Sequence, residues 1–560
     1  MPGGPVTFDK GTGPITKPAG VRQALPAIGV AAFAAFGGIL FGYDTGTISG
    51  ILTMQAFRNQ YGSPMPGDPS IAGDMTAGNY LSTGDTSLVV SILSAGTFVG
   101  ALLGAPLADI LGRRWGLQAA LVIFDVGVIL QMVSTALPLF IVGRVIAGLG
   151  VGVVSTIVPM FQSETAPRWI RGAVVSGYQW CITIGLLLAA IVNNSTQTRT
   201  DSGSYRIPIG VQFAWAIILA VGLLVLPESP RWLVKKGKTE QAAKALARLN
   251  STDVDDALVR SELADIQTAY DFELANSKTT YMACFAGGER KMWFRTMTGT
   301  LLQGWQQLTG INFIFYYGTT FFKSTGAGDP YLFTIASNVV NVVMTIPSFF
   351  LMERAGRRWL LVGGAFYMAV CELIVAALGT HYGTSNPAAQ KALVGFVCLY
   401  VAGFACTWGP AAWVVCGEIF PTGIRAKAMS LCTASNWLWN FGIGYATPYL
   451  VDSGPGKAGL ASKVFWVWTG TCFLAGVFAF FTVYETKGLS LEEVDQLYLQ
   501  TSPLRSNAVN QQLKDARTDI EIAATHGKVL DDEAVIADRA KHSVTADTKD
   551  ASSLEEKSSH

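Results

Sequence analysis

A group of eight amide and indole side chains lies inside apolar stretches of this chain, where each must find a partner. Amides both donate and accept hydrogen bonds, and an indole adds a flat apolar wall. A ring of hydroxyls with one apolar face is the kind of ligand that such a group fits. The alternative is that the amides only tie helices together. The predicted binding residues are Gln179, Gln306, Gln307, Asn312, Asn341, Trp413, Asn436 and Asn440.

A carboxylate and a guanidinium also lie deep in apolar stretches. Asp44 falls in the first stretch and Arg144 falls early in the fourth. A charge at that depth is costly unless it is paired, so we expect the two groups to neutralise each other. Because the arginine favours the charged carboxylate and burial disfavours it, Asp44 can take a proton on one side of a membrane and release it on the other. The alternative is a fixed structural ion pair.

Other reactive side chains give no sign of a catalytic or metal centre. The eight cysteines lie mostly in apolar stretches without framework spacing, and the four histidines lie outside those stretches. No nucleophile–base set and no phosphate-binding loop is visible, so we expect neither an enzyme, nor a cofactor, nor a bound metal. A net charge of +1 gives no argument for nucleic acid. Asp125 and Glu372 are buried by position, without an assigned role.

Composition places the chain in a membrane. Half of its 560 residues are hydrophobic and only 14% are charged, against about 25% in a soluble domain. A membrane-spanning helix needs about 20 mostly apolar residues, which predicts an all-α protein with twelve transmembrane helices. The predicted spans are 26–54, 87–108, 116–135, 139–161, 173–193, 209–226, 296–322, 331–352, 360–380, 392–416, 428–450 and 462–484.

Charged phrases between the spans occur twice. Gly112-Arg-Arg-Trp115 returns as Gly356-Arg-Arg-Trp359. Two weaker echoes pair Glu164–Arg171 with Glu418–Arg425, and Glu228 with Glu485. Repeated phrases of this kind predict two similar halves of six helices that rock against each other around a central site.

The halves and the polar segments give the expected domain boundaries. These are a tail over 1–25, the first half over 26–227, a helical linker over 228–295, the second half over 296–484, and a largely disordered tail over 485–560. Within the linker, Thr239–Leu249 and Asp253–Leu274 are expected to be amphipathic helices. The basic loops fall on one side, so the positive-inside rule predicts that linker and both termini are cytoplasmic. Asn193 and Asn194 begin sequons in an outward loop, where glycosylation is possible.

Taken together, the motifs resemble those of the sugar porter family of the major facilitator superfamily, and especially its fungal plasma-membrane monosaccharide transporters. The resemblance covers about residues 25–495. It rests on Phe41–Gly46 with Asp44–Gly50, Asp109–Arg114, Gly143-Arg144, Pro227–Arg231, Gln306–Asn312 with Tyr316-Tyr317, Glu353–Arg358 and Glu485–Gly488. It implies uptake of a hexose, most simply glucose, through the plasma membrane.

The resemblance also implies roles for single residues. All the predicted binding residues match sugar-contacting positions of the family, which expects a break in the seventh span at Thr309-Gly310. Tyr316 and Tyr317 match gate residues, and Asp44 with Arg144 match the coupling pair of its proton symporters. Ala405 replaces a glutamate of mammalian facilitators, which favours proton coupling. Tyr484 departs from the family, which usually has proline there.

Charges on the basic side are expected to form a latch that holds the two halves together when that side is closed. Single exposed bridges contribute about 0–1 kcal/mol, but a network can bias a two-state equilibrium. Asp109 and Glu353 are expected to bond neighbouring helix N-termini. The predicted network is Arg113, Arg114, Glu164, Arg171, Glu228, Glu353, Arg357, Arg358, Glu418, Arg425 and Glu485.

Other functions remain open at this point. An uncoupled hexose facilitator would carry the same motifs, because yeast facilitators also keep the aspartate. A sugar sensor shares the fold, although such sensors typically have tails longer than the 76 residues after 484. A carrier for quinate, a polyol or a disaccharide is the third alternative. The expected partners are a sugar, a proton and the lipid bilayer.

Overall fold

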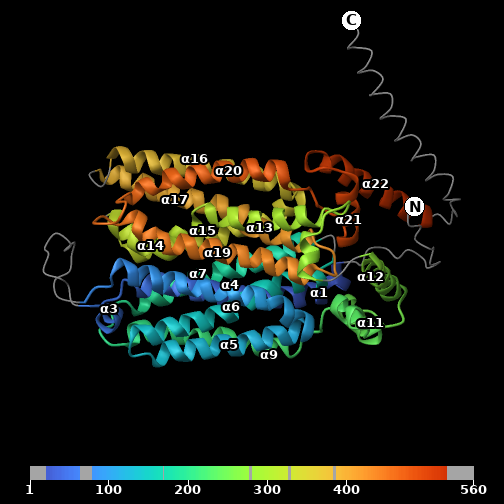
Figure 1. Cartoon of the computed structure of the whole chain (residues 1–560), viewed down its shortest axis with the longest axis horizontal. Helices are drawn as coiled ribbons and strands as arrows, with labels where there is room; N and C mark the ends of the chain where they lie inside the picture. Colours follow the sequence, from blue (N-terminus) through green and yellow to red (C-terminus); the bar gives the residue numbers. More distant parts are fainter. Residues whose placement is uncertain are drawn as a thin grey trace, which may run out of the picture. The chain divides into compact units, whose positions relative to one another are not determined.

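The computed structural model describes residues 21–63, 79–167, 170–276, 280–325, 329–382 and 386–525. Residues 19–510 form one compact unit, and Gln511 begins a second. The described residues are helical apart from loops and one isolated bridge between Ser63 and Tyr80. The chain is therefore an all-α membrane protein (Figure 1).

The first half contains six spans, of which the first and sixth are each made of two consecutive helices. α1 and α2 join end to end at Phe36, and α8 and α9 join at Val211. The helices are α1 (Val21–Ala35), α2 (Gly37–Ile51), α3 (Gln55–Tyr61), α4 (Thr83–Ile110), α5 (Arg113–Val133), α6 (Leu137–Thr165), α7 (Arg171–Thr196), α8 (Gly203–Gly210) and α9 (Gln212–Leu223).

The second half repeats the arrangement, with breaks in its first and fourth spans. The helices are α13 (Met292–Leu308), α14 (Ile311–Thr325), α15 (Pro330–Arg354), α16 (Arg357–Tyr382), α17 (Pro387–Cys406), α18 (Trp408–Glu418), α19 (Arg425–Val451), η3 (Ala461–Val464) and α20 (Phe465–Thr482). The breaks separate α13 from α14 and α17 from α18.

Hydropathy alone identifies ten of the twelve spans. The other two are the α13–α14 pair and α19. α13 and α14 are each short, and α19 begins with Arg425 and Lys427 and carries Asn436 and Asn440. The break shortens α13 and α14, and the polar residues of α19 lower its hydropathy, so both exceptions come from features of the predicted binding site.

Close packing of small residues brings the helices of each half together. Gly152 of α6 faces the backbone of α4, where a Cβ atom would meet the carbonyl oxygen of Thr97. Such contacts let backbones approach closely in lipid, where no hydrophobic effect drives helices together. Contacts of this kind hold α4 to α6 and α2 to α7 in the first half, and so position the spans that carry Asp44 and Arg144.

The linker between the halves is a small helical bundle. It contains α10 (Pro230–Lys235), α11 (Thr239–Asn250), α12 (Ala257–Asn276) and η2 (Tyr281–Phe285). Ser229 caps α10 by accepting from the Trp232 N–H, and Pro230 stands at the first helical position, where it needs no donor. Trp232 and Leu246 belong to a buried apolar cluster that joins α10, α11 and α12.

The segment after the last span is more ordered than expected. α21 (Leu491–Gln500) begins with a capping box between Ser490 and Glu493, and it is followed by η4 (Pro503–Arg505) and α22 (Ser506–Thr525). Residues 491–525 of the tail that was expected to be largely disordered are therefore mostly helical. The rest of that tail, 526–560, and most of the N-terminal tail, 1–20, lie outside the described residues.

Candidate functional site

A hydrogen-bonded hub of amides joins α13 to α19. Asn436 Nδ2 donates to Gln303 Oε1 (2.7 Å) and Gln306 Oε1 (2.8 Å), and Asn436 Oδ1 accepts from Gln307 Nε2 (2.9 Å). Gln307 Oε1 in turn accepts from Asn440 Nδ2 at 3.2 Å. Gln303 was missed in the sequence, although it lies on the helical face of Gln306 and Gln307, one turn earlier.

The break between α13 and α14 brings Asn312 into this hub, as expected. Gly310 has φ +82°, which ends α13 at Leu308 and lets α14 begin at Ile311. Asn312 Nδ2 then donates to Gln307 Oε1. An uninterrupted helix would separate residues 307 and 312 by 140° around its axis, about 100° per residue.

A second helix break, between α17 and α18, positions the tryptophans beside the hub. Thr407 separates α17 from α18, and the carbonyls of Trp408 and Gly409 in the first turn of α18 accept from Gln306 Nε2 at 3.1 and 2.9 Å. Trp408 itself donates to Leu361 O at 2.8 Å, so it packs against α16. Trp413, one turn along α18, is buried with its indole edge-on to the Tyr178 ring at 5.4 Å.

Several buried polar atoms near these elements have no hydrogen-bond partner among the described residues. They include both side-chain polar atoms of Asn341 on α15, the Tyr178 hydroxyl on α7 and the Trp437 indole nitrogen on α19. Trp437 packs on Phe41 of α2 at 4.8 Å between ring centroids. Buried polar groups are costly unless paired, so these are the groups that suit a ligand rich in hydroxyls. Gln179, also buried on α7, is the remaining predicted contact.

Both tyrosines predicted as gate residues are buried on α14 and bonded to α19. Tyr316 Oη donates to Asn440 Oδ1 (2.8 Å), which also accepts from Ser94 Oγ of α4 (2.6 Å). Tyr317 Oη donates to Gly444 O (2.7 Å). Asn440 therefore connects the hub to a helix of each half.

Asp44 and Arg144 form the ion pair expected from the sequence. Arg144 Nη1 lies 2.9 Å from Asp44 Oδ1 and 3.0 Å from Oδ2, and both side chains are enclosed. Nε and Nη2 of Arg144 have no hydrogen-bond partner among the described residues. Tyr316, which bonds the hub through Asn440, lies near enough to the pair for both charges to act on its hydroxyl.

The repeated charged phrases lie at one end of the bundle, which we call the basic end. Arg113 pairs with Glu164 through Nη2 (2.6 Å) and Nε (2.8 Å), and its Nη1 donates to Ala108 O. Glu228 accepts from the backbone N–H groups of Arg113 (3.0 Å) and Arg114 (3.1 Å). Burial raises the pKa of Glu228, against the effect of Arg113 and these N–H groups.

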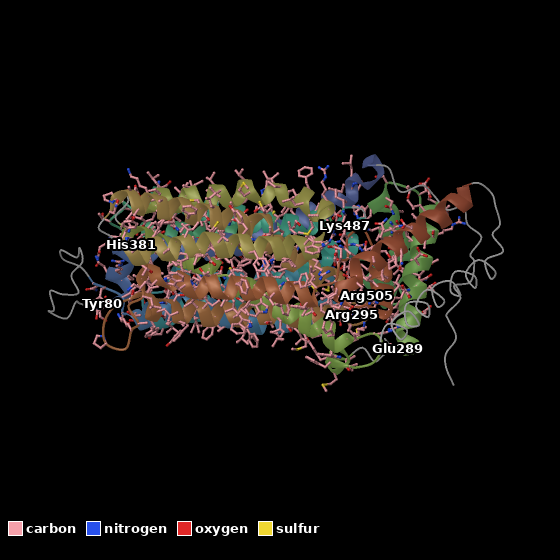
Figure 2. All side chains as sticks on the ribbon, turned by 90° about the horizontal axis from the view of Figure 1, so that it is seen from above. Tyr80, Glu289, Arg295, His381, Lys487 and Arg505 are labelled. Atoms are coloured by element: carbon pink, nitrogen blue, oxygen red, sulfur yellow. The ribbon has the colours of Figure 1, made fainter. Side chains whose placement is uncertain are left out.

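The second half copies this arrangement atom for atom. Arg357 pairs with Glu418 through Nη2 (2.8 Å) and Nε (3.1 Å), and its Nη1 donates to Met352 O. Glu485 accepts from the backbone N–H groups of Arg357 (3.0 Å) and Arg358 (3.2 Å). Figure 2 shows Arg295 and Lys487 at this end and Tyr80 and His381 at the opposite, distal end.

The expectation that these pairs join the two halves is therefore wrong for both arginine–glutamate pairs. Each half carries a complete set of charges, and the helices that bear the partners are neighbours within that half. Contacts between halves here are of another kind: Glu353 and Arg357 lie against Gly172 of α7, and the charge of Arg425 acts on Glu164. Arg171 is buried at the start of α7.

Asp109 makes the direct ionic bridge between halves that the sequence reasoning missed. Its carboxylate accepts from Lys427 of α19 and from Lys235 of the linker, each at 2.8 Å. It was expected to bond a helix N-terminus instead. Burial lowers the pKa of Lys235, while Asp109 opposes that effect. The bridge ties α4, the linker and α19 together at the basic end.

At the distal end the halves are joined by hydroxyls. Thr53 Oγ1 lies 2.6 Å from Tyr331 Oη, Ser49 Oγ lies 3.4 Å from Thr319 Oγ1, and Thr83 donates to Asp452 (2.9 Å). A cavity of about 10 Å³ lined by Ser49, Thr319 and Tyr331 is at the lower limit of size for a single water molecule. Contacts therefore join the two halves at both ends.

Asn193, one of the two sequon asparagines, also lines this cavity. Its Nδ2 donates to Gly46 O and Thr47 O, both at 3.2 Å, and α7 continues past it to Thr196. The side chain is only 2% exposed. A glycan cannot be attached there without dismantling the packing of α2 on α7.

Known proteins share this architecture. Residues 30–498 match the family model "Sugar (and other) transporter". The chain is 50% identical over 518 residues to the major facilitator-type transporter ecdD of Aspergillus rugulosus, covering 91% of this chain and 93% of that protein. It is 46% identical over 481 residues to the probable glucose transporter rco-3 of Neurospora crassa, covering 85% and 80%.

Two further proteins bear on function. The high glucose sensor RGT2 of Saccharomyces cerevisiae is 41% identical over 487 residues, covering 86% of this chain and 62% of the sensor. The proton:xylose symporter XylE of E. coli, bound to 6-bromo-6-deoxy-D-glucose, superposes with a TM-score of 0.72 at 29% identity, covering 85% of this chain and all of that one. The chain belongs to the sugar porter family of the major facilitator superfamily.

Proposed function

We propose that this protein carries a hexose, most simply glucose, into the cell by alternating access, together with a proton. The observation that carries the proposal is the amide hub around Asn436 and Asn440, which touches the Asp44–Arg144 region through Tyr316. A site of paired amides and buried indoles suits a hydroxylated ring. The neighbouring ion pair supplies a proton site within the same closed space.

The predicted binding residues have different roles in sugar binding under this proposal. Asn341 has both polar atoms available for sugar hydroxyls, and Trp413 and Trp437 offer apolar faces. Gln306, Gln307 and Asn312 are held in place by the hub and by the two helix breaks, so they are already oriented when a sugar arrives. Gln179 approaches from the first half, which makes sugar affinity sensitive to the closure of the halves.

Proton coupling follows from the ion pair. With Asp44 charged, Arg144 holds α2 to α6. A proton on Asp44 removes that attraction and leaves Arg144 without its counter-ion, so α2 is freer to move. Because Tyr316 senses both charges and bonds Asn440, protonation on this account also changes the amide hub and raises sugar affinity.

The basic end is the cytoplasmic side in this proposal. Arginines and lysines gather there with the linker, and cationic loops remain in the cytoplasm. Both termini and the linker are then inside the cell, and the membrane is the plasma membrane. Asp109–Lys427 closes the cytoplasmic side, and the arginine–glutamate pairs keep each half rigid while it rocks.

Of three alternative functions, sensing has specific support. Uncoupled hexose facilitation would use the same hub with Asp44–Arg144 as a fixed pair. Sensing without net transport is favoured by the 41% identity to RGT2, a named glucose sensor. Carriage of quinate, a polyol or a disaccharide would need the same amides to serve a differently shaped ligand.

The test is uptake of labelled glucose at pH 5 and pH 7.5 in yeast that lacks its own hexose carriers, with and without a protonophore. We expect accumulation above the outside concentration that collapses with the protonophore and with Asp44→Asn. Uptake that only equilibrates at either pH would make the protein a facilitator. Normal surface expression without uptake would favour a sensor or another substrate.

A further inference from the structure

Glu372 is a carboxyl in the middle of α16 that the proposed function does not use. Its side chain is fully enclosed, and neither carboxyl oxygen has a regular hydrogen bond among the described residues. The groups that act on it are the hydroxyl of Tyr400 on α17 and the thiol of Cys472 on α20. No cation reaches it among the described parts of the helices around α16, and Cys371 is the titratable neighbour on its own helix.

Both neighbours of Glu372 donate their hydrogen bond to the same acceptor, a backbone carbonyl. Tyr400 Oη donates to the Thr309 carbonyl at 2.7 Å, and Cys472 Sγ points its proton to the same oxygen at 3.8 Å. A carbonyl can only accept, and each of these groups has one proton. Towards Glu372 they offer lone pairs alone, which repel a carboxylate and suit a carboxylic acid.

The shared acceptor is the carbonyl at the break between α13 and α14. A helix end leaves its last carbonyls without partners in the helix, and α17 and α20 supply them here. Thr471 donates to Leu308 O at 2.6 Å, and the Trp468 ring fills the space beside Gly310. Glu372 is therefore next to the side chains of α17 and α20 that hold the break in place. The break in turn positions Gln307 and Asn312.

We propose that Glu372 is a positioning residue of the transport site and a second proton-binding group. As a neutral acid it donates to Tyr400, which leaves the tyrosine proton on the Thr309 carbonyl and fixes the break. When Glu372 loses its proton, the carboxylate competes for that tyrosine proton and the break loosens. The inference rests on the proposed sugar site, but it is separate from Asp44, which belongs to the other half.

The proposal predicts how sugar binding and the stability of the fold change with pH. Raising the pH favours the ionised carboxyl, so we expect weaker sugar binding and a less stable fold at alkaline pH. Unfolding exposes Glu372 to water, where a glutamate is already ionised at neutral pH. A folded state that keeps the proton on Glu372 therefore gains stability over the unfolded state as the pH falls through the neutral range. A glutamine at 372 keeps one donor without a titrating proton and should remove this dependence.

The test compares wild type, Glu372→Gln, Tyr400→Phe and the double variant in two assays between pH 5.5 and pH 8. Asp201→Asn, which neutralises an exposed carboxyl that is ionised throughout this pH range, is the control. Glucose uptake should show a KM that rises by about fivefold with pH in wild type and stays flat in Glu372→Gln. Tyr400→Phe should raise KM with little change in kcat, and the double variant should show no further pH effect.

The second assay is thermal unfolding of the purified protein without sugar, which does not depend on transport. The melting temperature of wild type should fall with rising pH more steeply than that of Glu372→Gln, while Asp201→Asn keeps the slope of wild type. Parallel melting curves for wild type and Glu372→Gln would overturn the inference, whatever the uptake assay gives. Absence of glucose uptake by wild type, with the expected melting difference, would instead refute the proposed substrate and leave the proton site standing.

Discussion

At the residue scale, function depends on where polar atoms find their partners. Asn436 is the centre of the hub because one amide serves three glutamines of α13, which fixes their orientations with respect to the ligand. Asn341 is its opposite, since it is buried without a partner among the described residues. A site of this kind combines preorganised amides with free ones, which lowers the entropy that binding must overcome.

We predict that Asn436→Ala raises the KM for sugar by about tenfold or more. A net hydrogen bond contributes about 0.5–1.5 kcal/mol, and the substitution removes three. Uptake kinetics at constant surface expression measure the effect. Gln118→Ala is the control, because that amide ties α5 to Ala220 O away from the hub. Equal KM values for the two variants would mean that the hub only holds helices together.

At the element scale, the break in the seventh span matters most. α13 and α14 place Gln307 and Asn312 on one ligand-facing surface only because Gly310 adopts a positive φ. The ring of Trp468 lies where a side chain at 310 would go. Both the backbone conformation of Gly310 and the ring packed against it therefore maintain the break.

Gly310→Ala should abolish transport or reduce it to a small residue. A side chain at this φ is strained by about 1–2 kcal/mol, and its Cβ would also enter the Trp468 ring. The matched control is Gly318→Ala in α14, the helix that follows the break, where a Cβ meets Phe322 at an ordinary 3.7 Å. Uptake by each variant, normalised to surface protein, checks this; near-normal uptake by Gly310→Ala would contradict it.

The helix after the last span is attached to α13 in a way that involves the unusual Tyr484. Arg295, at the start of α13, pairs with Asp495 of α21 and lies 4.1 Å from the Tyr498 ring. Tyr484 stacks on Tyr498 with centroids 4.0 Å apart. The family's usual proline at 484 could not make this contact, so the departure has a structural purpose.

We expect Asp495→Asn to lower the free energy of unfolding by about 1.5–3 kcal/mol, because it leaves the buried Arg295 without its counter-ion. Asp201→Asn breaks the exposed pair with Arg199 and should cost about 0–1 kcal/mol. Melting temperatures of the purified variants compare the two. Equal melting temperatures for the two variants would show that the Arg295–Asp495 pair does not stabilise the fold more than an exposed pair does.

Much of the fold could be predicted from sequence because spans, breaks and repeats leave local signals. Apolar length gives the spans, Thr309-Gly310 gives the break, and the recurring Gly-Arg-Arg-Trp phrase gives the two halves. The partners of single charges could not be predicted, because composition does not say which neighbour is nearer. Arg113 therefore pairs within its half, Asp109 reaches Lys427 across the halves, and Asn193 turns inward although its sequon suggests exposure.

At the scale of the whole transporter unit, contacts join the halves at both ends, but the two ends use different chemical groups. Charges join the halves at the basic end through Asp109 and Lys427, whereas hydroxyls such as Thr53 and Tyr331 join them at the distal end. Single hydroxyl bonds are weak and easily exchanged with water. Opening at the distal end should therefore cost less than opening at the basic end, which suits a carrier that waits for sugar outside.

The central claim is that the Asp44–Arg144 pair couples a proton to hexose movement, and purified protein in liposomes tests it most directly. One proton moving down 100 mV and one pH unit supplies about 3.7 kcal/mol, enough for roughly 500-fold accumulation. With such an imposed gradient, we predict that labelled glucose accumulates well above its outside concentration in wild-type liposomes and only equilibrates with Asp44→Asn. Simple equilibration by the wild-type protein, unchanged by the gradient, would contradict the account.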